Sequence, residues 1–321
     1  TKLFFQDIID NSSLISLYDF ANTNGIFPAV DSNMKFTLLT LRCHRSDIRI
    51  KCEFVFSALT VEDIQYPNKK FTLLPDDIYQ INPNTKNCPV FRSSIDAEIN
   101  KYIYRRVPVL INDNDPEHGN HWGIKFSTMF HMSNDSHLFK TKQQLEKLGF
   151  ELKGNRFVNG NTVYLPLYEA KMIHHFDYRW SNADDSDEVT SIHKRNGNFE
   201  VIPRYWVSTG DFPDDFVDKS CFFGFRNITN VTNERSLITS AFPISAVGHS
   251  LIVIRSNKYR QLPMFISNAN SFSCDYIVRQ KLGGTNMTYG YVMQFPILPP
   301  EIYTHPACLL LGKSLTSCVL E

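Results

Sequence analysis

The first sixty residues alternate short apolar runs with polar turns in a way that predicts a helix followed by buried strands. Apolar residues within 4–9 recur at helical spacing. Apolar runs at 14–18, 35–41 and 53–59 have the length and composition of strands. A helix that precedes several buried strands is typical of α/β proteins, so this segment predicts the edge of an α/β sheet.

From residue 61 to 115 the pattern becomes helical. Pro75 suits the first turn of a helix over 75–80, because proline lacks the N–H that this position leaves unbonded. Ser93 and Asp96 have the spacing of a helix cap. Apolar residues then follow at helical spacing, which predicts a second helix with a buried apolar face: Ile95, Ile99, Tyr102 and Ile103.

The polar, turn-rich segment 112–119 predicts a domain boundary. Beyond it, short apolar runs predict many strands, and two helices are expected near 141–148 and 258–281. The expected strands lie around 124–130, 151–157, 163–167, 199–207, 221–225, 237–242 and 250–254. The whole pattern predicts a mixed α/β (α+β) fold.

Composition limits the class of protein. The chain has 321 residues, 42% of them hydrophobic, which is enough for a large core and about two domains. The sequence contains no apolar run long enough for a membrane span and does not open with a signal-peptide pattern. Seven cysteines without CxxC spacing indicate reduced thiols, no metal site and a cytoplasmic protein without a membrane partner.

The charges balance, with 33 basic and 33 acidic residues. Proteins that bind DNA through charge alone are usually basic, because phosphate neutralisation supplies much of their affinity. Neutrality therefore counts against charge-driven binding, but it leaves room for a protein whose positive charge is local.

Two polar stretches in the last third carry the candidate chemistry: residues 226–235 and 279–286. Both are rich in residues that bond base edges and phosphates, and apolar runs flank both. Asn can pair bidentately with adenine and Arg with guanine in the major groove. The predicted DNA-binding residues are Arg226, Asn227, Asn230, Asn233, Arg235, His249, Lys281, Thr285 and Asn286.

These stretches, together with residues 17–20, Phe27-Pro28 and 35–41, resemble the C-terminal half of bacterial adenine-specific DNA methyltransferases and of fused type II restriction–modification methylases. The resemblance implies three parts. Residues 1–60 would be the last strands of a Rossmann-like methyltransferase domain, 61–115 a helical bridge, and 116–321 the target-recognition domain that reads double-stranded DNA.

The resemblance also implies a reaction: methyl transfer from S-adenosylmethionine to the exocyclic amine of adenine, with Phe27 stacking on the flipped base. The Asn-Pro-Pro-aromatic loop and the glycine-rich cofactor loop of the family are absent from this sequence. In the family both lie upstream of the matching region. We therefore expect an excerpt that is catalytically incomplete, binds no S-adenosylmethionine by itself and works with an upstream catalytic half.

Two other functions are compatible with the pattern. A stand-alone DNA specificity subunit is one, although such a protein has no reason to keep Phe27-Pro28. A magnesium-dependent nuclease is the other, since Glu169-Ala170-Lys171 has the acidic-x-Lys order of many restriction nucleases. The segment Asn134–His137 has side chains that suit DNA contact, but its composition favours a turn.

Overall fold

The computed structural model describes residues 2–43, 51–183, 189–216 and 220–304. The chain divides into two compact units. Unit 1 comprises Thr1–Asn120 and Met293–Pro299, and unit 2 comprises His121–Val292 and Pro300–Glu321. The fold is mixed α+β in both, and each unit is described by itself.

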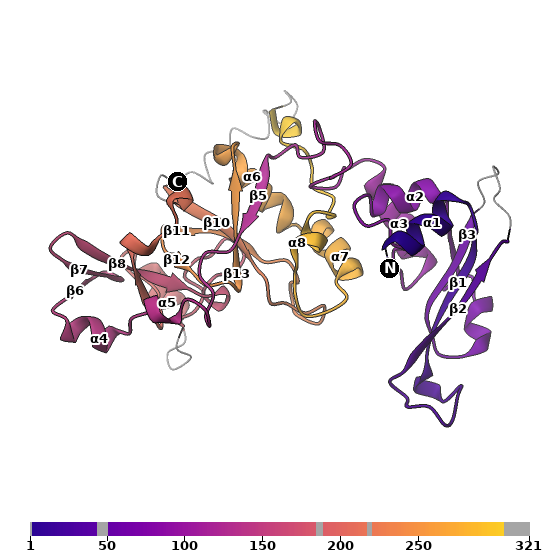
Figure 1. The fold of residues 1–321 in the computed structure, drawn as a ribbon, viewed down its shortest axis with the longest axis horizontal. Coiled ribbons are helices and arrows are strands. Elements are labelled where there is room, and N and C mark those ends of the chain that lie inside the picture. The colour runs from indigo at the N-terminus through magenta and orange to yellow at the C-terminus, as the bar shows by residue number, and fades with distance from the viewer. Residues whose placement is uncertain (1, 44–50, 184–188, 217–219, 305–321) are drawn as a thin grey trace. The chain divides into compact units, whose positions relative to one another are not determined.

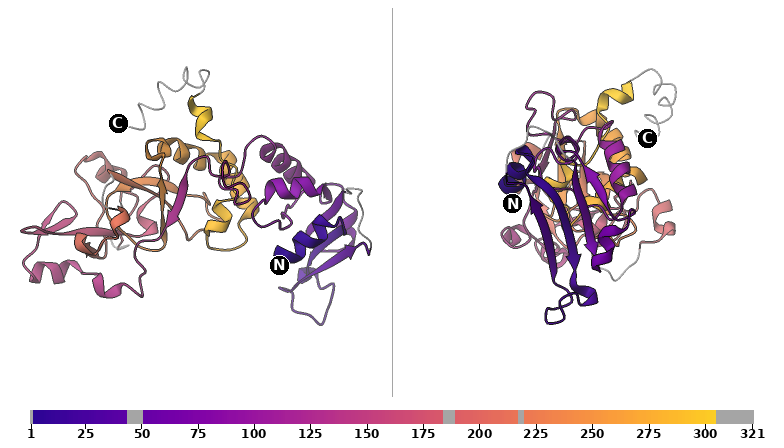
Figure 2. Two further views of the ribbon diagram at one scale, coloured as in Figure 1. Left: turned by 45° about the horizontal axis from the view of Figure 1, so that its top comes forward. Right: turned by 90° about the vertical axis from the view of Figure 1, so that its right-hand side faces the viewer.

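Unit 1 is built on a four-stranded sheet in the order β2-β1-β3-β4. The strands are β1 (Leu14–Ala21), β2 (Lys35–Leu41), β3 (Cys52–Ala58) and β4 (Phe71–Leu73). β1 runs parallel to β3, and the other pairs are antiparallel. The strands expected at 14–18, 35–41 and 53–59 are confirmed. β1 and β2 form a long hairpin whose tip lies far from the α-helices of this unit (Figures 1 and 2).

The described part of unit 1 contains the α-helices α1 (Lys2–Asp10), α2 (Pro75–Ile81) and α3 (Ser94–Tyr104). The expected caps are confirmed. Pro75 opens α2, and the Ser93 hydroxyl accepts a hydrogen bond from the Asp96 N–H at 3.1 Å. The sequence positions of helix starts were therefore predictable from local chemistry alone.

The buried face of α3 differs from the prediction. Ile95 and Tyr102 are exposed, whereas Asn100 and Tyr104 are buried. The Asn100 Nδ2 donates to the Asp96 carbonyl within the helix, and the Tyr104 hydroxyl donates to the Gln294 carbonyl at 2.8 Å. Helical spacing identified the helix, but the tertiary partners of Tyr104 decided which side faces the core.

The first sheet of unit 2 is antiparallel, in the order β11-β10-β13-β5. Its strands are β5 (Ile124–Ser127), β10 (Cys221–Arg226), β11 (Thr239–Pro243) and β13 (Leu251–Ser256). Gly224 of β10 lies against the β13 backbone, and a Cβ at this position would come within 2.6 Å of the Ile252 carbonyl oxygen. Glycine is thus required for this close strand pairing.

The second sheet of unit 2 has the order β12-β8-β7-β6, with β9 paired to β8. Its strands are β6 (Glu151–Lys153), β7 (Arg156–Asn159), β8 (Thr162–Tyr168), β9 (Trp206–Ser208) and β12 (Ala246–Val247). The strand expected over 199–207 was too long, because the ladder with β8 involves only 206–208. The single strand expected over 151–157 is a hairpin of β6 and β7.

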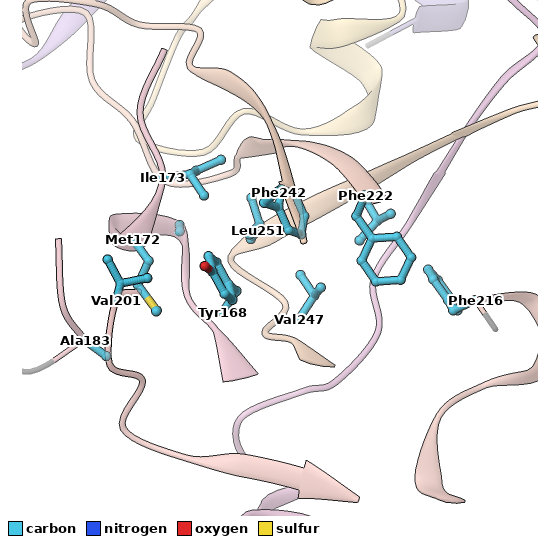
Figure 3. Packing of buried hydrophobic residues seen from close by; sticks show 12 residues of the cluster. Tyr168, Met172, Ile173, Ala183, Val201, Phe216, Phe222, Phe242, Val247 and Leu251 are labelled. Carbon is cyan, nitrogen blue, oxygen red and sulfur yellow. The ribbon is translucent and has the colours of Figure 1, made fainter. Parts of the chain in front are cut away.

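An apolar cluster joins the two sheets of unit 2 (Figure 3). Tyr168 at the end of β8 stacks on Phe242 of β11, with ring centroids 5.7 Å apart. Phe222 of β10 packs edge-on against the same Phe242 ring. Because these side chains are fully or almost fully buried, β10 is held firmly up to Arg226, where the first polar stretch begins.

The helices of unit 2 are α4 (Lys142–Lys147), α5 (Ser191–Arg195), α6 (Leu262–Ala269), α7 (Phe272–Lys281) and α8 (Tyr289–Val292). The single helix expected over 258–281 is instead interrupted at Asn270-Ser271. Ser271 caps the new helix, since its hydroxyl accepts from the Cys274 N–H at 3.1 Å. This break points α7 toward the first polar stretch.

Within the described ranges, no helix combines the length and the apolar character that crossing a bilayer requires.

Candidate nucleic-acid interface

The two polar stretches of the last third lie side by side in unit 2. We call segments 226–236 and 283–287 the paired loops. The Thr229 N–H donates to the Thr285 carbonyl at 3.0 Å, and the Met287 N–H donates to the Asn227 carbonyl at 2.6 Å. Ile228 and Asn286 form an antiparallel bridge between these bonds. Residues 58 positions apart in sequence, Ile228 and Asn286, therefore share one small ladder.

Arg279 of α7 holds the first loop through its backbone. Its guanidinium donates to the carbonyl oxygens of Val231, Asn233 and Glu234 at 2.6, 2.7 and 2.5 Å. A planar fork of five N–H donors suits three converging acceptors, which a lysine ammonium could not match in direction. The loop conformation is thus fixed by groups that are common to every residue type.

Asp275, one turn before Arg279 on α7, holds the other end of the same loop. This carboxylate is 4% exposed and accepts from the N–H groups of Ser236 and Leu237 at 2.7 and 3.1 Å. It also pairs with Arg279 at 2.9 Å. An ion pair that carries additional hydrogen bonds satisfies the carboxylate fully and rigidifies its surroundings.

The side chains at the crest of the paired loops face solvent. Asn233, Thr285 and Asn286 are exposed, although their backbones are bonded within the protein. Asn227 and Asn230 are half-buried, and the Asn230 side-chain oxygen accepts from the Thr232 N–H at 3.1 Å. The structure therefore brings these predicted residues together, with three of them presented outward and two shaping the turn.

Arg235 does not have the outward orientation expected for a residue that reads bases. Its side chain is 12% exposed, its Nε lies 3.6 Å from Asp275 Oδ2, and it donates to the Asn270 carbonyl at 2.5 Å. The prediction that Arg235 faces DNA was wrong. The Asp275 carboxylate and the Asn270 carbonyl offer the guanidinium two partners inside the fold, and these direct the side chain inward.

Arg226 is likewise turned inward, contrary to the prediction. Its guanidinium donates to the carbonyl oxygens of Ile173 and Lys171, the Nε bond to Ile173 being 2.9 Å. Burial lowers its pKa to about 10, so it remains protonated at neutral pH. Arg226 thus links the end of β10, where the first of the paired loops begins, to the segment after β8.

Lys281 and His249 flank the paired loops. Burial lowers the pKa of the Lys281 ammonium group well below its usual value, and the side chain is half-buried rather than fully exposed. His249 stacks on His131 with ring centroids 4.4 Å apart, and its Nδ1 accepts from the Met132 N–H at 3.5 Å. It adjoins Ser250, whose carbonyl accepts from the Asn227 N–H.

Positive charge gathers in this region although the chain is neutral. Segment 226–286 contains seven Lys and Arg residues against two Asp and Glu, a formal charge of +5. Arg226, Arg235 and Arg279 are bonded within the protein, so they contribute to the local potential more than to direct contacts. The sequence-wide balance of charge concealed this asymmetry.

His174 stacks on Trp180 and lies near the charge of Arg226. Its ring centroid is 4.1 Å from that of Trp180, and Lys194 lies over the same Trp180 ring at 4.7 Å. Burial first, and then the charge of Arg226, lower the His174 pKa to about 4. The imidazole is therefore neutral at physiological pH and acts as a packing group.

This shifted pKa predicts that unit 2 loses stability in acid. The unfolded chain binds a proton at His174 below about pH 6.5, whereas the folded chain does so only near pH 4. The contribution of neutral His174 is present above pH 6.5 and is lost as the pH falls toward 4. We expect about 1 kcal/mol after allowance for partial exposure. Urea unfolding of His174→Gln should depend less on pH between 7 and 5 than that of the wild type, whereas exposed His137→Gln should match the wild type.

In unit 1, Phe27 lies in the loop at the tip of the β1–β2 hairpin. Its ring is 49% exposed and packs edge-on against Phe36, with centroids 4.8 Å apart. Asn22, only 1% exposed, organises this loop: its Nδ2 donates to the carbonyls of Phe27 and Val30 at 3.0 and 2.8 Å, and its Oδ1 accepts from the Phe27 N–H at 2.9 Å. The ring is held on one edge while much of it remains accessible.

The nuclease alternative gains no support from the geometry. Glu169 follows β8 and is succeeded by a 3-10 turn, so the triplet does not lie on a strand as expected. Its carboxylate lies 3.9 Å from the Arg204 guanidinium. Among the residues with described positions, no three His, Cys, Asp or Glu side chains gather as a metal site would require.

The segment Asn134–His137 forms a turn, as its composition favoured. The Asp135 carboxylate accepts from the His131 N–H at 2.7 Å, and a 3-10 helix spans Ser136–Leu138. The segment is assigned to the turn on this basis.

Sequence reasoning missed Asp275, Arg279 and Asn22 as residues that position the two loops. Asp275 and Arg279 have the i, i+4 spacing of a helical ion pair, which was a usable signal. Nothing local indicated that their partners lie about 40 to 50 residues earlier in the chain. Asn22 resembled any turn asparagine.

No family model and no curated protein matches this chain. Among solved structures, it is similar to one described as the type IIG restriction endonuclease BpuSI. The identity is 11% and the TM-score 0.40, and the alignment covers 100% of this chain and 40% of that one. The chain thus spans well under half the length of that protein, and the function proposed next rests on the residues of the chain itself.

Proposed function

We propose that this chain supplies DNA sequence recognition to an S-adenosylmethionine-dependent adenine-N6 DNA methyltransferase of a restriction–modification system. The paired loops of unit 2 contact double-stranded DNA. One observation carries the proposal: the loops are fixed through their backbones, while the side chains of Asn233, Thr285 and Asn286 face solvent. Base readout needs hydrogen-bonding side chains in a rigid register.

The local charge supports the same role. Arg226, Arg235, Arg279 and Lys281 stand against Glu234 and Asp275 in and beside the paired loops, a formal charge of +2 that attracts a polyanion. Affinity would then come from the positive electrostatic potential. The choice of DNA sequence would come from the exposed amide and hydroxyl side chains. Arg226, Arg235 and Arg279 serve the first purpose and stabilise the loops, but they do not read bases.

The Phe27 loop favours a methyltransferase portion over a stand-alone specificity subunit. A buried asparagine organises the loop backbone and leaves the Phe27 ring half-exposed at a hairpin tip. Such a ring suits stacking on a base that has left the duplex, because the extruded base loses its neighbours. In this proposal the upstream half binds S-adenosylmethionine and carries out the transfer, while Phe27 stacks on the adenine.

Selection from a pool of random duplexes tests recognition by the paired loops. The wild-type chain should enrich one sequence, and Asn233→Ala with Asn286→Ala should relax the choice at some positions, since each base contact is worth about 1–3 kcal/mol. Asn161→Ala, an exposed asparagine in the β7–β8 turn, is the matched control. Identical enriched sites for the wild type and the double variant would contradict the proposed readout.

A further inference from the structure

Phe272, the first residue of α7, is the most exposed large apolar side chain in the described part of unit 2, at 81%. A phenylalanine at a helix start has no structural need to face water so fully. Its neighbour Ser271 already caps the helix, so the ring contributes nothing to that cap. A single exposed apolar side chain is common on protein surfaces, so the position of this ring beside the paired loops is what matters.

One face of this ring is supported. The guanidinium carbon of Arg235 lies 4.5 Å from the ring centroid. Arg235 is itself held by Asp275 at 3.6 Å and by the Asn270 carbonyl at 2.5 Å. The Arg235 guanidinium therefore packs against one face of the ring and is itself held in place. The rest of the ring surface is accessible to a ligand. Arg235 belongs to the first of the paired loops, so the ring adjoins the candidate interface.

We propose that Phe272 is a stacking contact for a base of the bound DNA, inserted where the duplex is partly unstacked. This inference rests on the proposed function. A base has a π-face whatever its sequence, and aromatic side chains substitute for a lost neighbour in the stack. The cation behind the ring withdraws electron density from it, which favours an electron-rich base on the opposite face.

Arg235 acquires a different role in consequence. It is a positioning residue: it supports the ring and is itself oriented by Asp275. The apolar ring also complements the exposed amides of the loops. The amides bond base edges, whereas insertion of the ring depends on how easily a base-pair step unstacks. Phe272 then contributes to the choice of sites by deformability.

Binding to the selected duplex at several salt concentrations tests the proposal. Phe272→Ala should weaken binding about 10-fold at every salt concentration, in the range of one base–aromatic stack, and leave the salt dependence unchanged because no charge is removed. Phe272→Trp should restore the affinity. Ile192→Ala, which removes another exposed apolar side chain of unit 2, is the control and should bind as the wild type.

A fluorescence readout is independent of affinity. Of the three tryptophans, Trp122 and Trp206 are each 1% exposed, and Trp180 is 44% exposed. In a Trp180→Phe background, the added Phe272→Trp should lose emission when saturating duplex is added, while the background alone should not.

The outcomes separate the two proposals. If the wild type binds the duplex and Phe272→Ala binds it equally well, the stacking role is overturned and loop recognition stays intact. Unquenched emission from the Phe272→Trp variant has the same meaning. A wild-type chain that enriches no duplex overturns recognition by the loops and the stacking role with it.

Discussion

Replacing Asp275 by Ala is expected to lower the free energy of unfolding of unit 2 by about 3–5 kcal/mol, the range for removing one partner of a buried ion pair. The carboxylate is 4% exposed and bonds two backbone N–H groups and two arginines. Its loss leaves the Ser236 and Leu237 N–H groups without their acceptor and the Arg235 guanidinium without its counter-ion. Amide exchange at Ser236 and Leu237, together with urea unfolding, measures the effect.

Two further variants show which interactions of Asp275 account for the lost free energy of unfolding. Asp275→Asn keeps an acceptor for the two N–H groups but removes the charge, so it should fall between wild type and Asp275→Ala. Asp211→Ala removes an exposed aspartate of unit 2 and should change stability by less than about 0.5 kcal/mol. If Asp275→Ala unfolds at the wild-type urea concentration, the network around α7 does not hold the loop.

Replacing Asn22 by Ala is the second large effect that we expect, a loss of about 2–4 kcal/mol in unit 1. The side chain is 1% exposed and bonds the loop backbone as both donor and acceptor. Without it, the Phe27 N–H and the Phe27 and Val30 carbonyls lose their partner, and no isosteric backbone bond replaces it. The loop should open, which cleavage before Asp31 by endoproteinase Asp-N reports directly.

The matched control lies two residues away. Asn24 is exposed in the same 3-10 turn, so Asn24→Ala should be cleaved at the wild-type rate. Phe27→Ala should leave the unfolding free energy nearly unchanged, because the ring is half-exposed. Equal protease resistance of Asn22→Ala and the wild type would show that the loop is held by other contacts.

Local chemistry determined which parts of the fold were predictable. Helix starts at Pro75 and Ser93 follow from proline geometry and side-chain capping, which need no distant partner. Burial does need one. The exposed Ile95 and the fully buried Asn100 on α3 reverse the expected faces, because the buried Tyr104 bonds to the distant Gln294 carbonyl and turns this side of the helix inward.

The candidate site shows the same division. Residue composition located both loops and correctly marked Asn233, Thr285 and Asn286 as exposed polar positions. It misjudged Arg235, because the direction of an arginine side chain depends on where its carboxylate lies. That carboxylate is Asp275, 40 residues later, and only the fold brings the two together.

The hold that Arg279 exerts on carbonyl oxygens has a consequence for how such a loop can diversify. The oxygens of Val231, Asn233 and Glu234 exist whatever side chain the position carries. Substitutions there can alter the displayed chemistry while the backbone trace persists. The backbone conformation of the loop therefore does not depend on the side chains that it displays. Single substitutions can change what the loop binds without changing its fold.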